Sequence, residues 1–220
     1  MKDYRNLDKI VAGLRREYSF GKLEEGELCK NPFEQFSRWL EDAVRRRVPH
    51  LDTMALATAT PKGKPSVRVV LLKGFDRRGF VFYTHYDSRK GREIKMNPRA
   101  EMVFFWGPFE RQVRIAGRLA KVSALESDLY FATRPRASQI GAWASHQSRP
   151  IKSRREIERR VREIEQKFRG RKIPRPPFWG GYCLQPEAFE FWQGRKSRLN
   201  DRFLYRSTRV ADWTMTRLQP

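Results

Sequence analysis

The sequence predicts an α+β barrel of six or more mainly antiparallel strands with peripheral helices. Short segments rich in branched and aromatic residues follow one another with turn signals between them, as in an antiparallel meander. Helical segments are inserted between the strands, but without the regular βαβ alternation of a doubly wound sheet. No repeat or Gly/Ser-rich linker divides the chain, so we expect a single domain over residues 1–220.

The first predicted helix spans residues 31–47, with an Asn N-cap, Pro at the first helical position and Glu34 at the capping-box position. Its apolar residues recur on one face, as in a helix that packs against a core. The period then changes to that of strands. The first group of predicted strands covers residues 53–60, 66–73, 80–84, 100–106 and 111–122.

Helical segments interrupt the strands after residue 84. A short helix is expected to begin at Ser88 and to end at Asn97-Pro98. Further helices are predicted at 123–134, with Ser123 and Glu126 as a capping box, at 136–145, and from Ser153, capped with Glu156, to Phe168. The last predicted strands are residues 182–185, 188–193, 202–206 and 213–218.

The short helix at Ser88 carries its charges at the unfavourable end. Arg89, Lys90 and Arg92 lie in its first turn, where the exposed backbone N–H groups already have a partial positive charge. Each cation there should cost roughly 0.3–1 kcal/mol. We therefore expect a phosphate dianion at this helix start, where backbone and side chains would both bind it.

The whole chain is strongly basic, with 47 Lys and Arg against 25 Asp and Glu and a formal charge of +22. This charge predicts an anionic partner, either nucleic acid or a phosphorylated small molecule. The basic residues at the ends of predicted elements are dispersed, which suits two phosphates better than a polyanion. They are Arg68, Lys73, Arg89, Lys90, Arg134, Arg136 beside Ser138, Arg198 and Arg202, and the residues that could face a flat heterocycle are Tyr83, Gln112, Gln147 and Trp192.

Several other classes of protein are disfavoured. The sequence has no GxGxxG after a strand, no Walker loop, no HExxH and no GxSxG. His50, His85 and His146 are scattered, and Cys29 and Cys183 lack CxxC spacing, so neither a metal site nor a disulfide framework is expected. The first residues contain no apolar signal segment, and no run approaches the ~18 apolar residues of a membrane span. We expect a cytoplasmic protein without a membrane partner.

Nine stretches of the sequence resemble the pyridoxamine 5′-phosphate oxidase family in order and spacing, from about Leu14 to the C-terminus. They are RVVLLK (68–73), YT (83–84), SRK (88–90), RQV (111–113), RPRASQIGAW (134–143), SHQS (145–148), FWGGY (178–182), EFWQG (190–194) and RLNDRFLY (198–205). The resemblance implies an FMN-binding split barrel that forms a homodimer with FMN sites at the subunit interface. It also implies oxidation of pyridoxine or pyridoxamine 5′-phosphate to pyridoxal 5′-phosphate, with O2 as electron acceptor and H2O2 as product.

The resemblance also implies site residues. FMN contacts fall to Arg68, Val69, Val70, Leu71, Leu72, Lys73, Tyr83, Thr84, Arg89, Lys90, Gln112, Gln147, Ser148, Trp192 and Arg202. Substrate contacts fall to Lys73, Tyr130, Arg134, Ser138, Arg198, Leu199 and Asn200, and to Arg15, Arg16, Glu17 and Tyr18 in a flexible or lid segment, residues 1–18. Arg198 and Asn200 are the expected catalytic residues, although the family usually has His where this chain has Asn200.

Two structural expectations follow for these residues. Arg68 and Lys73 have opposite parity along one strand, so a bulge, a twist or a strand end should separate them. Gln147 and Ser148 lie in a linker far from Arg68 in the sequence, which suggests that a second subunit contributes them.

Three alternatives remain. The nearest is a related flavin oxidase acting on another substrate, such as a phenazine precursor. A nucleic-acid-binding protein would use the basic region 152–175, although Glu156, Glu158, Glu163 and Glu165 lie within i,i+4 reach of its arginines and no aromatic residues alternate with them as a single-strand platform requires. The third is a flavin-storing or regulatory protein without turnover.

Overall fold

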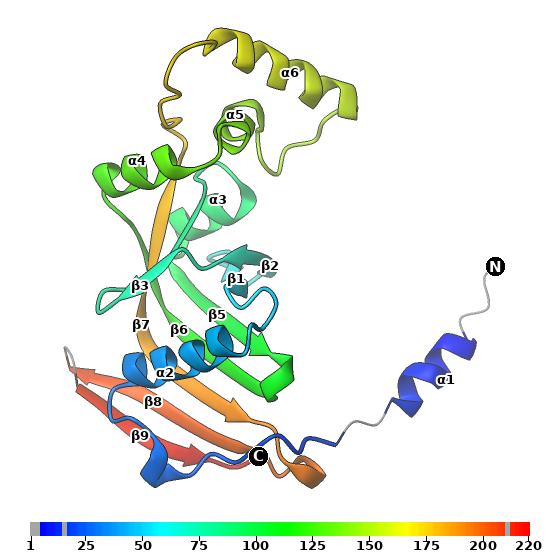
Figure 1. Ribbon diagram of the computed structural model, residues 1–220, viewed down its shortest axis with the longest axis vertical. Coiled ribbons are helices and arrows are strands. Elements are labelled where there is room, and N and C mark those ends of the chain that lie inside the picture. Colours follow the sequence, from blue (N-terminus) through cyan, green and yellow to red (C-terminus); the bar gives the residue numbers. More distant parts are fainter. Residues whose placement is uncertain (1–4, 15–16, 210–211) are drawn as a thin grey trace.

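The computed structural model describes residues 5–14, 17–209 and 212–220, which form a nine-stranded antiparallel sheet and six α-helices (Figure 1). The strand order is β2-β1-β5-β6-β7-β4-β3, with β8 beside β7 and β9 beside β8. Strand β2 also lies against β4, which closes the first strands into a barrel. The strands are β1 Thr53–Ala59, β2 Pro65–Leu71, β3 Gly74–Asp76, β4 Gly79–His85, β5 Arg99–Trp106, β6 Arg111–Lys121, β7 Trp179–Gln193, β8 Asp201–Arg209 and β9 Asp212–Leu218. The predicted α+β barrel is confirmed.

Most of the helices are gathered near one end of the sheet. Figure 1 shows α3 to α6 gathered beyond one end of β7, whereas β8, β9 and the C-terminus lie at the other end. The α-helices are α1 Arg5–Gly13, α2 Pro32–Arg45, α3 Arg89–Met96, α4 Ala124–Thr133, α5 Arg136–Ala144 and α6 Arg154–Lys167. Three short 3-10 turns complete the set, η1 Glu25–Glu27, η2 Gly107–Phe109 and η3 Lys196–Arg198.

Helix α2 covers the main hydrophobic core. The Asn31 side chain accepts a hydrogen bond from the Phe33 N–H at 2.9 Å, which confirms the predicted N-cap. Phe36, on the apolar face of α2, is fully buried and packs edge-on against Phe80, with ring centroids 4.9 Å apart. This aromatic packing fixes the barrel on which the surrounding loops and helices are mounted.

The structure corrects the predicted division of the strands after residue 178. The predicted strands 182–185 and 188–193 are parts of one strand, β7. Pro186 lies within it, opposite a register shift between Ala116 and Gly117 of β6. Because proline has no N–H for the ladder, it suggested a break, but a β-bulge accommodates it without ending the strand.

Other boundaries also differ in detail. Strand β3, which was not predicted, follows directly after Lys73, and β2 ends at Leu71. The expected strand end between Arg68 and Lys73 is therefore confirmed. Helix α6 forms as predicted, but the Ser153 side chain makes no capping hydrogen bond.

Candidate cofactor and substrate site

The largest cluster of predicted site residues lines a cavity of about 540 Å³ between β2, β4, α4, α5 and the start of β7. Among the described residues, its lining includes three cations, Lys73, Lys90 and Arg134, and no carboxylate, although Lys73 pairs with Asp52 beside it at 2.9 Å. The other predicted residues that line it are Val69, Val70, Leu71, Tyr83, Thr84, Tyr130, Ser138 and Gln147. Side chains assigned to both FMN and substrate thus share one electropositive cavity.

At one end of the cavity, Lys90 extends from the first turn of α3. Its Nζ donates to Gln147 Oε1 at 2.9 Å and to Thr84 Oγ1 at 3.1 Å, so its contacts are neutral oxygens. Burial and the charge of Arg68 lower the pKa of Lys90 to about 8. A bound anion would supply the negative charge that these contacts lack. The hydrogen bond between Lys90 and Gln147 places Gln147 in the cavity of its own chain. This corrects the expectation that a second subunit contributes Gln147.

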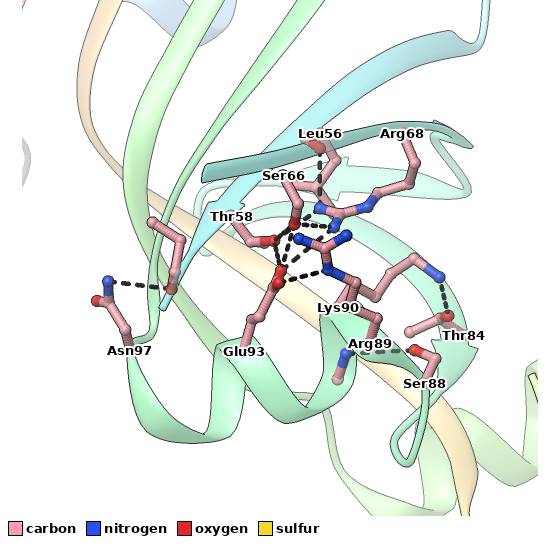
Figure 2. A network of polar contacts seen from close by, with 12 residues as sticks. Leu56, Thr58, Ser66, Arg68, Thr84, Ser88, Arg89, Lys90, Glu93 and Asn97 are labelled. Atoms are coloured by element: carbon pink, nitrogen blue, oxygen red, sulfur yellow. Dashed lines mark hydrogen bonds and ion pairs between the residues drawn. The ribbon is translucent and has the colours of Figure 1, made fainter. Parts of the chain in front are cut away.

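The arginines expected beside Lys90 lie just outside the cavity lining, where they share a buried carboxylate (Figure 2). Glu93 Oε1 accepts a hydrogen bond from Arg89 Nε at 2.9 Å, and Glu93 Oε2 lies 3.3 Å from the Nη2 atom of Arg68. Ser88 caps α3 as predicted, accepting from the Gly91 N–H at 3.2 Å. The cations at the start of α3 therefore have a counter-charge within the chain, which sequence reasoning missed even though Arg89 and Glu93 have i,i+4 spacing.

Arg134, also in the cavity lining, lies over the ring of Trp179, with its guanidinium carbon 4.7 Å from the ring centroid. Its Nη1 is buried and finds no hydrogen-bond partner within the described parts of the chain. Burial lowers the pKa of this guanidinium. An unsatisfied buried donor of this kind is costly, and a phosphate oxygen would satisfy it.

Stacked aromatic side chains also line the cavity. Tyr83 stacks on Tyr130 with centroids 3.8 Å apart and on Trp179 at 5.4 Å. His85, not predicted as a site residue, also lines the cavity and stacks on Phe178. Burial and the charges of Lys90 and Arg134 lower the pKa of His85 to about 4, so its ring is neutral near pH 7.

A second cluster lies on β6, β7 and β8. Gln112 is directly opposite Trp192, and Trp192 is directly opposite Arg202, so the three side chains form a row on one face of the sheet. Tyr18 contacts Trp192 edge-on, with centroids 5.4 Å apart. Tyr18 therefore reaches this cluster, and none of the described residues up to Tyr18 lines the main cavity.

The predicted catalytic loop belongs to the second cluster. Ser197 and Arg198 both have left-handed backbone conformations, with φ of 56° and 60°. Glu17 accepts from the Ser197 N–H at 3.1 Å, and the Asn200 side chain accepts from the Arg195 N–H at 3.0 Å. These two hydrogen bonds hold the strained turn, so Asn200 has a positioning contact in addition to its predicted place in the site.

The remaining predicted residues lie elsewhere. Leu72 is buried in the main core, and Leu199 and Ser148 are exposed, with Ser148 in a left-handed conformation at φ 68°. Arg15 and Arg16 lie outside the described residues. The structure thus divides the predicted site into two groups.

Trp179 and Trp192, one from each group, lie toward opposite ends of one strand. Trp179 begins strand β7 and Trp192 lies near its end, 13 residues later. At about 3.3 Å per residue a straight strand would span at most roughly 40 Å here, and the bulge at Pro186 shortens that span. Figure 1 shows the same separation, with α3 to α5 at one end of β7 and the loop before β8 at the other.

Other kinds of site find no support in the described part of the chain. There, no group of three or more His, Cys, Asp or Glu residues could hold a metal ion. None of the helices described combines the length and apolar character of a membrane span.

Comparison with known proteins identifies the family. Residues 40–168 match the family model described as pyridoxamine 5′-phosphate oxidase, and residues 179–220 match the pyridoxine 5′-phosphate oxidase C-terminal dimerisation region. The chain is 57% identical to the pyridoxine/pyridoxamine 5′-phosphate oxidase of Rubrobacter xylanophilus over 96% of both chains. It is 56% identical to that of Paraburkholderia xenovorans, covering 96% of this chain and 99% of the relative.

A solved structure agrees with this assignment. PhzG from Burkholderia lata, in complex with tetrahydrophenazine-1-carboxylic acid, superimposes with a TM-score of 0.85 at 33% identity, covering 93% of this chain and 100% of that chain. The chain belongs to the pyridoxamine 5′-phosphate oxidase family.

Proposed function

We propose that this protein is an FMN-dependent oxidase that converts pyridoxamine and pyridoxine 5′-phosphate to pyridoxal 5′-phosphate, reducing O2 to H2O2. The observation that carries this proposal is the cavity lined by stacked aromatic rings and by Lys90 and Arg134, whose cationic groups lack a full set of partners among the described residues. Relatives more than half identical over nearly the whole chain bear the name of this activity.

The residues present fit a flavin nucleotide. Lys90 has only neutral hydrogen-bond acceptors, and Arg68 and Arg89 lie beside it, so a phosphate group would complete its charge balance. Residues 69–71, Tyr83, Thr84 and Gln147 would hold the rest of the cofactor. Bound FMN would supply the two-electron redox chemistry that links the substrate to O2.

The chain itself binds and orients the substrate. Arg134, Ser138 and Tyr130 line the cavity, and Lys73, which also pairs with Asp52 at 2.9 Å, adds a second cation. The buried, unpartnered Nη1 of Arg134 would donate to the substrate phosphate. Fixing the phosphate in this way positions the pyridine ring and contributes to the rate by lowering the entropic cost of reaction.

We further propose that a second copy of the chain completes the site. Gln112, Trp192 and Arg202 are not among the residues that line the cavity, and Trp192 lies near the end of β7 opposite its cavity-lining start at Trp179. In a homodimer these residues, and the Arg198 to Asn200 loop, could meet the cavity of the partner subunit. The C-terminal region that matches the dimerisation model contains Trp192, Arg202 and this loop, which supports the arrangement.

In this proposal the N-terminal segment covers the site that the two subunits form. Residues 1–18 close over the completed site as part of the one domain formed by residues 1–220. Glu17 and Tyr18, which contact Ser197 and Trp192, support this role.

A related flavin oxidase with a phenazine-type substrate is the second candidate, favoured by the close superposition on PhzG. The identity of 33% to PhzG is well below the 57% shared with a vitamin B6 oxidase, so we rank this candidate second.

Spectroscopy of the purified protein tests the proposal directly. We expect a yellow protein with bound FMN, whose visible flavin band bleaches when pyridoxamine 5′-phosphate is added without air. Admitting O2 should restore the band, with formation of pyridoxal 5′-phosphate and H2O2. A flavin-loaded protein that produces no pyridoxal 5′-phosphate from either vitamer would refute the proposed reaction, and bleaching by a dihydrophenazine carboxylate alone would favour the second candidate.

A further inference from the structure

Glu93 is a buried carboxylate held by side chains from three elements. Only 4% of its side chain is exposed. Oε2 accepts from Thr58 Oγ1 and Ser66 Oγ, both at 2.5 Å, and is 3.3 Å from Arg68. Oε1 accepts from Arg89 at 2.9 Å, so β1, β2 and α3 converge on one acid (Figure 2).

The charge around Glu93 does not balance in the cofactor-free chain. Arg68, Arg89 and Lys90 contribute three positive charges, and Glu93 is the carboxylate that contacts the two arginines. Burial raises the pKa of Glu93, but hydrogen bonds from Ser66, Thr58 and Arg89 and the charge of Arg68 outweigh this and lower it to about 2. Glu93 is therefore ionised near neutral pH, and the cluster has a net charge of about +2, the charge that a phosphate dianion would neutralise.

We propose that Glu93 is a resident counter-charge that substitutes for the cofactor phosphate in the free protein and, by competing with it for Arg68 and Arg89, sets the affinity for phosphorylated flavin. This inference rests on the proposed FMN site. It assigns Glu93 two opposed effects. The carboxylate stabilises the cofactor-free protein and weakens binding of the phosphate group.

The chemistry of the neighbours allows the charge of Glu93 to be tested apart from its shape. Two of its donors, Thr58 and Ser66, are hydroxyl groups, which can accept as well as donate hydrogen bonds. The variant Glu93→Gln keeps nearly the same shape and can still accept from Arg89, while the hydroxyl groups reorient to its amide. The change therefore removes mainly the negative charge.

The binding experiment compares FMN with riboflavin, which lacks the phosphate, by flavin fluorescence titration of the cofactor-free protein. In Glu93→Gln we expect FMN affinity to rise by about tenfold, the effect of one partly screened charge, with riboflavin affinity unchanged. Glu93→Asp keeps the charge and should keep the ratio of the two affinities within about twofold of the unsubstituted protein. An unchanged or lower FMN-to-riboflavin ratio in Glu93→Gln would overturn the proposal.

A matched control removes another carboxylate that pairs with a partly buried arginine. Asp42 on α2 contacts Arg111 at 2.8 Å, and neither residue lines the cavity. Asp42→Asn should lower stability without changing the FMN-to-riboflavin ratio. A similar ratio change in this control would attribute the effect to general destabilisation and contradict the specific role of Glu93.

A second measurement needs no flavin. The thermal midpoint of cofactor-free Glu93→Gln should fall by about 2–4 °C or more in chloride buffer, and inorganic phosphate should restore it more than it raises the midpoint of the unsubstituted protein. If the variant does not fold in chloride, refolding in phosphate should recover it. If phosphate raised the thermal midpoints of the variant and the unsubstituted protein equally, the proposed role of Glu93 as a counter-charge would be overturned. If neither protein bound FMN, the proposed cofactor would be refuted instead.

Discussion

Lys90 is the cavity residue whose charge depends most directly on its surroundings. Its ammonium group contacts only the neutral oxygens of Thr84 and Gln147, and burial together with Arg68 lowers its pKa to about 8. In the cofactor-free protein Lys90 is thus mostly charged below pH 8 and mostly neutral above it. A phosphate dianion binds the charged form, so binding should raise this pKa again.

This ionisation predicts the pH dependence of FMN binding. Between pH 7 and 9.5, FMN affinity should fall once the pH passes about 8, by at most about tenfold per pH unit, because a proton must then be taken up with the cofactor. Riboflavin affinity should change much less. Titrations of both flavins across this range measure the effect. In Lys90→Met the FMN curve should be weaker and flat, and a persisting break near pH 8 in that variant would assign the ionisation to another group.

The start of helix α3 shows how packing can reverse an intrinsic preference. A Cβ added at Gly91 would lie 2.0 Å from the Tyr86 carbonyl oxygen, so the helix rests directly on the preceding backbone. A Cβ added at Gly141 in α5 would meet nothing within 4 Å. Alanine normally stabilises a helix interior by roughly 0.5–1 kcal/mol relative to glycine.

We therefore expect opposite results from two identical substitutions. Gly141→Ala should raise the free energy of unfolding by about 0.5–1 kcal/mol, as helix propensity dictates. Gly91→Ala should lower it by about 1–3 kcal/mol, because the clash with backbone atoms forces α3 away from Tyr86. Urea denaturation of both variants measures the difference. Stabilisation by Gly91→Ala would show that α3 does not pack as the structure describes.

The elements that the sequence predicts well are those with local signals. Asn31, Ser88 and Ser123 each accept a hydrogen bond from the first turn of the expected helix, because capping depends on residues only two or three positions apart. Strand β7 was divided wrongly, because the bulge that accommodates Pro186 depends on pairing with β6, more than sixty residues away in the sequence.

The site residues, too, were predicted where the signal is local in the sequence and missed where it depends on distant residues. Lys90 and Arg134 could be selected from their places at the ends of elements. Glu93 was missed because its role depends on Thr58 and Ser66, which only the folded barrel brings next to α3. The placement of Trp179 and Trp192 on one continuous strand could not be foreseen either, since the sequence suggested a break at Pro186.

At the scale of the whole molecule, one face of the sheet is unusually apolar for an exposed surface. Val67 is 70% exposed and Phe105 57% exposed, and strand pairing places both on the same face as Gln112, Trp192 and Arg202. Exposed apolar patches of this kind are typical of subunit interfaces. The proposed partner contacts and the apolar patch thus occupy one surface.

If this face joins two copies, a charge on it should abolish assembly and cofactor binding together. Val67→Lys should yield monomers in sedimentation experiments and weaken FMN binding by at least about tenfold, because burying an unpaired charge in an interface costs several kcal/mol. Leu125→Lys, at a comparably exposed apolar position on α4, should remain dimeric and bind FMN normally. A monomeric Val67→Lys protein with full FMN affinity would contradict a site completed by the partner subunit.

Helix α6 is densely charged, with six Lys and Arg and four Glu among its 14 residues. Its apolar residues Val161 and Ile164 pack against a small hydrophobic core that includes Phe131, Ile140 and Phe168. Helical spacing therefore directs Arg155, Arg159 and Arg162 to the opposite, solvent-facing side. Ion pairs with glutamates on α6 are made by Arg154, Arg159 and Arg160. Exposed pairs of this type contribute little to stability, and a polyanion could replace them readily.

We therefore expect binding of nucleic acid at low salt that lacks sequence preference. Fluorescence anisotropy with unrelated DNA oligomers should give equal affinities. The logarithm of the association constant should fall linearly with the logarithm of the salt concentration, and the magnitude of this slope should decrease by about 0.7–0.9 for each phosphate contact removed. The double variant Arg155→Gln, Arg162→Gln should reduce this slope by about 1–2 while leaving FMN binding unchanged, since neither residue lines the cavity. A strong preference for one oligomer, or tight binding that persists at high salt, would instead indicate a dedicated nucleic-acid partner, because counterion release alone produces neither.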